Sequence, residues 1–136
     1  MDAVRKYLEG DRYARLCDIS LLEVQPGNAR ARMVLSDKHL NGYGNVQGGA
    51  IFTLADYAFA AASNAHGTVA VGINVNISFV KAARTGTLTA IASETSRNTK
   101  LATYTVNVTD DAGSLVAIFS GMVYRKSEAV PGAKPA

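Results

Sequence analysis

Three stretches in the second half of the chain alternate between apolar and polar residues, which is the pattern of a β-strand with one buried face. In residues 69–79 the odd positions are valine, isoleucine or phenylalanine, and the even positions are small or polar. Residues 87–96 and 102–109 alternate in a similar way, whereas residues 115–124 are apolar on both faces, as in a central strand. Short links join the last three stretches, so the pattern predicts an antiparallel meander.

The first part of the chain predicts a short helix and a β-hairpin. Residues 2–10 have apolar side chains on one side and a glycine at the end, as in a short amphipathic helix. Residues 19–24 and 29–35 flank the sequence QPGN at positions 25–28. Proline followed by glycine suits the two central positions of a type II turn, so these two stretches should pair as neighbouring strands.

The segment Gly48–Asn64 predicts a long buried helix. It reads GGAIFTLADYAFAAASN, and its apolar residues surround the helix axis instead of forming one stripe. Its alanines favour a helix and allow close packing of the backbone. A buried helix needs other elements around it, and the predicted strands supply them. The sequence therefore predicts an α+β fold in which a curled antiparallel sheet surrounds one long central helix.

Length and composition restrict the class of protein. The chain has 136 residues and a mass of 14.3 kDa, which fits one domain. Hydrophobic residues make up 48% of it, so a core can form and intrinsic disorder of the body is excluded. We expect the domain to span residues 1–126, and residues 127–136 (SEAVPGAKPA) to form a flexible tail.

Charge and cysteine content exclude several kinds of partner. The net charge is +3 and the basic residues are scattered, so we expect no nucleic-acid partner. No stretch of eighteen residues lacks polar breaks, so we expect no membrane partner. The single cysteine suits a reducing compartment, and we expect the protein to be cytoplasmic. Cys17, His39 and His66 are too few for a Cys/His zinc site, so no metal is expected.

One segment carries the residues expected of a chemical site: NGYGNVQGG, positions 41–49, which leads directly into the buried helix. Four glycines in nine residues allow a ligand to approach the backbone closely. The free N–H groups of a helix N-terminus favour negative charge, so they can bind a phosphate or stabilise an oxyanion. The glycine spacing matches neither common nucleotide-binding pattern. The alternative is that these glycines only form a tight turn before the helix.

Asp56 is the second candidate. It lies within the predicted helix among apolar neighbours, where an aspartate is uncommon and is rarely buried without a partner. Seven residues, about two turns, separate it from Gly49, so both lie on nearly the same helix face. A carboxylate in apolar surroundings is how enzymes prepare a base or a nucleophile. The alternative is a solvated aspartate or one that caps a neighbouring loop.

The run LNGYGNVQGGAIFTLADYAFAAASN, residues 40–64, resembles the hotdog-fold acyl-CoA thioesterases of the phenylacetate-pathway type. The likeness continues through INVNISFVKAARTGTLTA and the closing VAIFSGMVYRK, covering about residues 10–126. The resemblance implies a hotdog fold and hydrolysis of an acyl-CoA thioester, with no cofactor apart from the coenzyme A of the substrate. It also implies homodimers with active sites at the subunit interface, commonly paired into homotetramers.

The resemblance assigns roles to individual residues. The N–H of Gly48 would polarise the thioester carbonyl, with Gly49 beside it. Asp56 would act as general base or nucleophile, and the residues leave these two roles open. Asn41 would place the substrate or the attacking water. The family usually has histidine where this chain has Gln47, which can donate a hydrogen bond or orient the loop but does not titrate near neutral pH.

Five further residues are weaker candidates for contacts with substrate. Asn74 and Asn76 stand on the polar face of a predicted strand and could bind an acyl or pantetheine amide, or form a contact between subunits. Arg84, Arg97 and Lys100 lie in predicted loops or at strand ends, where they could bind the phosphates of coenzyme A or simply be solvated.

We therefore expect an acyl-CoA thioesterase that acts as a dimer or tetramer. Residues 69–79 contain no proline and no charge to guard a sheet edge, so this strand should pair with its copy. The alternative function is a non-catalytic acyl-CoA-binding module. A hydratase is a third possibility, but that chemistry in related folds uses a histidine beside the acidic residue, and neither histidine of this chain occupies the matching motif.

Overall fold

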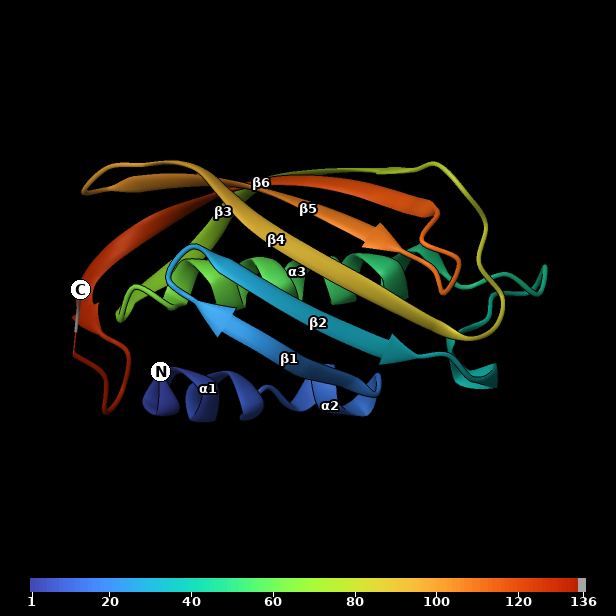
Figure 1. Ribbon diagram of the computed structural model, residues 1–136, viewed down its shortest axis with the longest axis horizontal. Coiled ribbons are helices and arrows are strands. Elements are labelled where there is room, and N and C mark those ends of the chain that lie inside the picture. Colours follow the sequence, from blue (N-terminus) through green and yellow to red (C-terminus); the bar gives the residue numbers. More distant parts are fainter. Residues whose placement is uncertain (135–136) are drawn as a thin grey trace.

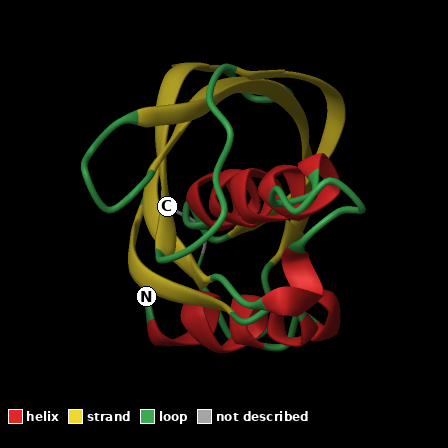
Figure 2. Cartoon of the chain, turned by 90° about the vertical axis from the view of Figure 1, so that its right-hand side faces the viewer, coloured by secondary structure: helices red, strands yellow, loops and turns green. Residues whose placement is uncertain are grey.

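Six antiparallel strands form one sheet that curls around helix α3 (Gly48–Asn64), as Figure 2 shows. The computed structural model describes residues 1–134. In the sheet the order is β1-β2-β4-β5-β6-β3. The strands are β1 (Ile19–Gln25), β2 (Asn28–Val34), β3 (Thr68–Phe79), β4 (Thr87–Arg97), β5 (Leu101–Thr109) and β6 (Leu115–Ala129). The predicted α+β architecture, with its meander of β4, β5 and β6, is confirmed.

Helix α3 begins and ends at the predicted residues, and the sheet covers most of its surface. Ten of its seventeen residues are buried. Phe59 packs its ring against Tyr104 and Phe119, with centroids 5.7 and 5.3 Å away. Gly121 on β6 permits this approach, because a Cβ there would lie 2.7 Å from the Phe59 ring. Aromatic packing and a small residue opposite it thus set the depth of α3 in the sheet.

The predicted hairpin and amino-terminal helix are confirmed. Gln25 pairs with Asn28, and Gly27 has a φ of +81°, which the third residue of a type II turn requires. Helix α1 (Asp2–Glu9) buries two apolar side chains. Two short elements were not predicted, α2 (Arg12–Leu16) and the 3₁₀ helix η1 (Asp37–His39). Each spans one turn or little more, which is too short for hydrophobic periodicity to show.

Strand β3 lies at one edge of the sheet and pairs only with β6. Its apolar face, predicted to be buried, is open within one chain: Val71, Ile73 and Val75 are 43%, 54% and 37% exposed. The expected alternation is interrupted by a register shift between Gly72 and Asn74. The described chain thus leaves an open, apolar sheet edge.

The carboxyl-terminal stretch differs from the expected boundary at residue 126. Strand β6 continues to Ala129, which pairs with Thr68. Val130 is fully buried, and its N–H donates to the carbonyl of Gly67 (2.8 Å). The local composition suggested a tail, but pairing with the start of β3 provides hydrogen-bond partners that composition does not reveal. Residues 135 and 136 of the expected tail lie outside the described residues.

Candidate active site

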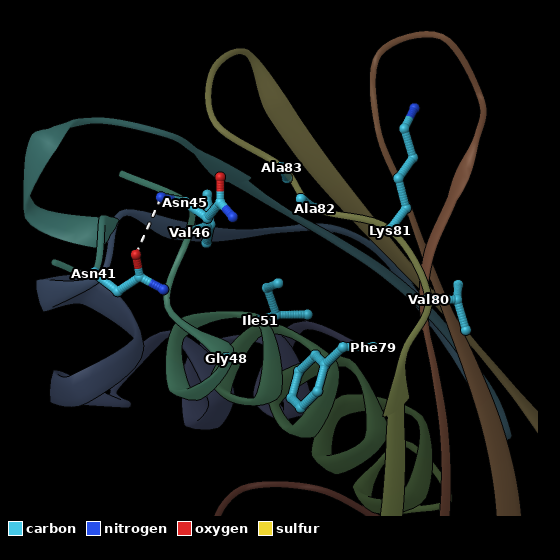
Figure 3. Close-up of a pocket in the computed structure, with 10 residues that line it drawn as sticks. All are labelled: Asn41, Asn45, Val46, Gly48, Ile51, Phe79, Val80, Lys81, Ala82 and Ala83. Atoms are coloured by element: carbon cyan, nitrogen blue, oxygen red, sulfur yellow. Dashed lines mark hydrogen bonds between the residues drawn. The ribbon is translucent and has the colours of Figure 1, made fainter. Parts of the chain in front are cut away.

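The glycine loop before α3 is held by its first residue, Asn41. The Asn41 Oδ1 accepts hydrogen bonds from the N–H groups of Tyr43 (2.9 Å) and Asn45 (3.1 Å). The Asn41 N–H donates in turn to the carbonyl of Asn45 (2.7 Å). Gly44, within this turn, has a φ of +91°, which favours glycine. The turn thus presents the amide nitrogen of Asn41 on the side where α3 begins (Figure 3).

Gln47 is the N-cap of α3 and determines which backbone N–H stays free. Its side-chain oxygen accepts the N–H of Gly49 (2.8 Å), and its carbonyl accepts those of Ala50 (2.9 Å) and Ile51 (3.3 Å). The N–H of Gly48 precedes these and has no acceptor among the described residues. This bond to Gly49 is compatible with the orienting role expected for the glutamine, and its amide nitrogen can still donate. The Gly49 N–H, expected beside the substrate, is used by Gln47 instead.

Gly48 opens onto a pocket of about 380 Å³ (Figure 3). Its lining comes from the glycine loop, the start of α3 and residues 79–83, and much of it is apolar. The Phe79 ring lies against Gly48, where an added Cβ would be 3.1 Å from Cζ. Lys81 lines the rim, but its ammonium group pairs with Asp110 (2.7 Å). The pocket therefore combines an apolar wall with a free backbone donor.

Arg84 is the one predicted cation that contacts a residue of the pocket lining. Its Nε donates to the Asn45 Oδ1 (2.8 Å). Asn45 belongs to the glycine loop but was not predicted as a site residue, because its hydrogen-bond partner Arg84 lies 39 residues away in the sequence. Its place in a loop that also holds Asn41 was the only sequence signal for it. The structure thus brings together Asn41, Gln47, Gly48 and Arg84, and adds Asn45.

The surroundings of Asp56 differ from the apolar ones expected, because its side chain is exposed in the single chain. It lies on the face of α3 that the sheet leaves open, with Gly49 and Thr53 at preceding turns. Partial burial by neighbouring groups nevertheless raises the pKa of Asp56, and the nearby carboxylate of Asp11 raises it further. The residue is thus a carboxylate of increased basicity on an uncovered helix face.

Four predicted residues lie elsewhere in the chain. Asn74 and Asn76 line a separate hollow on the outer face of the sheet, away from α3. Arg97 ends β4 and Lys100 lies in the turn before β5, at the opposite end of the molecule from the start of α3 (Figure 1). There Arg97 lies 3.5 Å from Glu94 and Lys100 lies over the ring of Tyr124. Within one chain these residues do not reach the Gly48 pocket.

A polar cluster just after the end of α3 contains His66. Its Nε2 bonds to the carboxylate of Glu94 (2.8 Å), which also accepts the hydroxyl of Tyr104 (2.8 Å). Burial raises the pKa of Glu94, but the hydrogen bonds from His66 and Tyr104 outweigh it and hold that pKa below its ordinary value. The cluster joins the end of α3 to the sheet, and His66 has a structural role there.

Residues 1–134 contain neither a cluster of metal ligands nor a membrane-spanning helix. In that part of the chain, no three histidine, cysteine, aspartate or glutamate side chains form a group that could hold a metal ion. None of the described helices is both long and apolar enough to cross a membrane.

Comparison with known proteins gives a consistent result. The thioesterase superfamily matches residues 43–117. A relative from Archaeoglobus fulgidus that is named as an esterase is 41% identical, over 96% of this chain and 86% of its own. The acyl-coenzyme A thioesterase PaaI of Escherichia coli is 31% identical, over 91% of this chain and 89% of its own.

Solved structures of similar fold include proteins of the same kind as the sequence relatives. The structure of E. coli PaaI, from the phenylacetic acid degradation operon, has a TM-score of 0.90 over 94% of both chains, with 29% identity. A Streptococcus mutans protein, solved bound to acetyl CoA, has a TM-score of 0.78 and 25% identity over 82% of this chain and 90% of its own. With a curled sheet around one helix and a glycine loop at the start of that helix, the chain belongs to the thioesterase superfamily and is a PaaI-like hotdog thioesterase.

Proposed function

We propose that this thioesterase hydrolyses acyl-CoA to a free acid and coenzyme A, with the thioester carbonyl bound at the N–H of Gly48. The observation that carries the proposal is this N–H, which is free in the described chain and borders a pocket. A donor at a helix N-terminus stabilises the oxyanion that forms when a carbonyl is attacked. The similarity to an acyl-coenzyme A thioesterase and to a protein bound to acetyl CoA supports the substrate class.

The carboxylate in this proposal comes from the other subunit. Within one chain, Asp56 follows Gly48 by eight residues, which is about 12 Å along a helix. A group that activates water must lie within about 3 Å of that water, and the water must reach the same carbonyl. Because Asp56 lies on the uncovered face of α3, a second copy can present it to the pocket. Asp56 of the partner subunit then activates water or attacks the carbonyl directly.

The remaining contacts are divided between the two chains. Asn41 presents its amide nitrogen near Gly48 and can hold the carbonyl or the attacking water. Arg84 is exposed and bonds to Asn45 of the pocket lining, so its terminal nitrogens can bind coenzyme A phosphates. Arg97 and Lys100 do not reach the pocket of their own chain, so they would have to bind the phosphates of a coenzyme A held in the pocket of the partner subunit. A single free cysteine supports the cytoplasmic location that the proposal includes.

The protein should form at least a homodimer through β3, with a homotetramer as the larger form. Light scattering at micromolar concentration should give two or four times the chain mass of 14.3 kDa. Ile73→Lys places a charge on the open edge and should reduce mass and activity together, because the partner's Asp56 is then lost from the site. Val34→Lys, at a similarly exposed position on β2, is the matched control. A wild-type mass of 14.3 kDa would rule the dimer out.

In the homotetramer, where pairs of dimers meet, Asn74 and Asn76 fit the alternative role of polar side chains at a contact between subunits. Their hollow on the outer sheet face is also lined by Thr103, Thr105 and Ser120. Hydroxyl and amide groups of this kind can pair across a contact between two sheets.

A panel of acyl-CoA substrates with detection of the free thiol tests the function. We expect turnover for at least one class among short, medium, long and aromatic acyl groups. Saturable binding without turnover across the whole panel would favour the non-catalytic acyl-CoA-binding module instead. The same panel identifies the acyl group.

A further inference from the structure

We infer that Asn45 is a substrate-binding residue whose side-chain amide donates a hydrogen bond to an amide carbonyl of the pantetheine arm. Arg84 is the positioning residue that orients this amide. The inference rests on the proposed function and adds a residue that recognises the non-reacting part of the substrate.

The orientation of the Asn45 amide follows from its partner. Arginine has only donors, so the atom that accepts the Arg84 Nε at 2.8 Å must be the Asn45 oxygen. The same logic applies to Asn41, whose oxygen accepts two backbone N–H groups. Both amides therefore direct their NH₂ groups away from the bonded oxygens, and Figure 3 shows both nitrogens on the inner side of the pocket.

Within one chain, the pocket consequently presents hydrogen-bond donors and no carboxylate. Its donors include the Gly48 N–H and the amide nitrogens of Asn41 and Asn45, and the lining contains no aspartate or glutamate among the described residues. Such a pocket selects a ligand with several carbonyl oxygens. The apolar side chains of Ile51 and Phe79 complete the wall and suit methylene groups.

The pantetheine arm has this alternation of carbonyls and methylenes. When the thioester carbonyl occupies the Gly48 N–H, the next acceptor along the substrate beyond the sulfur is an amide carbonyl of the arm. Asn45 belongs to the loop that leads to Gly48, and it is held from the opposite segment by Arg84. Because the amide is oriented before substrate binds, little side-chain entropy is lost when the hydrogen bond forms.

Asn45→Asp tests the donor while keeping the contact with Arg84. A carboxylate has the same shape and accepts from the guanidinium, but it presents an oxygen where the NH₂ group stood. We expect KM for acyl-CoA to rise about tenfold or more, with a smaller change in kcat, since a carbonyl then faces an acceptor. Asn107→Asp makes the same change at an exposed site on β5 and should leave KM unchanged.

Binding of an S-alkyl-coenzyme A thioether separates this inference from the proposed function. The thioether keeps the pantetheine amides, lacks the thioester carbonyl and cannot be hydrolysed. We expect its Kd to rise about tenfold in Asn45→Asp. This loss would support the Asn45 contact even if the wild type hydrolysed none of the acyl-CoA panel.

Arg84→Met tests the positioning role with S-acyl-pantetheine, which carries no phosphate. We expect KM to rise for this substrate too, because the Asn45 amide is no longer held. A rise confined to acyl-CoA would mean that Arg84 binds phosphates only and would overturn its positioning role. Unchanged thioether binding in both Asn45→Asp and Asn45→Ala, or no binding by the wild type, would overturn the Asn45 contact. Asn45→Ala keeps the test valid if the aspartate variant does not fold.

Discussion

Replacing Asp56 with asparagine should lower kcat for acyl-CoA hydrolysis by about 10²–10⁴-fold, which is the usual range for general-base assistance. The asparagine keeps the size of the side chain but loses the negative charge and the basic lone pair. KM should change much less, since the contacts at Gly48 and along the pocket remain. Steady-state kinetics with the best substrate of the acyl-CoA panel gives both constants. A folded variant that keeps more than about a tenth of the wild-type kcat would remove Asp56 from the mechanism.

The stability of the same variant provides the control. The pKa of Asp56 is raised in the folded protein, so folding disfavours its ionised form. The protonated form of Asp56 therefore adds to the free energy of unfolding at acid pH. This contribution is lost as the pH rises through the raised pKa of Asp56 in the folded protein. Asp56→Asn should therefore melt at the same or a higher temperature than the wild type at pH 7. A purely structural aspartate would show the reverse, a lower Tm with nearly full activity in the folded fraction.

Asp11→Asn is a useful companion because it changes the basicity of Asp56 without touching it. Asp11 caps α2 by accepting the N–H of Ala14 (2.9 Å), and asparagine caps equally well. Its carboxylate also raises the pKa of Asp56, so its removal should lower that pKa. The acid limb of the kcat/KM profile should then shift to lower pH, with activity near pH 8 unchanged.

Gly48→Pro should lower kcat by about 10²–10³-fold, because it removes the N–H that we propose to bind the oxyanion. Gly48 is the first residue of α3, where proline is well tolerated since no helical hydrogen bond is lost. The preceding residue, Gln47, already has the extended backbone that proline requires, with φ −65° and ψ 135°. The helix should therefore form normally in the variant.

Gly48→Ala is the matched control for the proline variant. Both add a Cβ 3.1 Å from the Phe79 ring, but only alanine keeps the N–H. The ratio of kcat between the two variants therefore removes the effect of crowding at Cβ and leaves that of replacing the N–H with the proline ring. Circular dichroism should give equal helix content for both. If alanine and proline lower kcat by the same factor, the Gly48 N–H does not take part.

The main elements of this fold could be predicted because their patterns are local. Alternation over residues 87–96 and 102–109 identifies two strands, and an apolar run rich in alanine identifies α3. The QPGN turn identifies the first hairpin, because only a few residues suit its backbone angles. The short α2 could not be predicted because so few residues show no hydrophobic periodicity, and the end of β6 at Ala129 could not because it depends on pairing with Thr68.

The candidate site was only partly predictable. The sequence by itself determined that a glycine loop leads into a buried helix with an aspartate two turns along, because these features are contiguous. Only the tertiary structure decided that Gln47 covers the Gly49 N–H and leaves that of Gly48 free. It also decided that Arg84 joins Asn45 across 39 residues, because the curled sheet brings the loop after β3 to the start of α3. Asp56 lies on an open face of α3 because one curled sheet covers a helix on most sides but not on all of them.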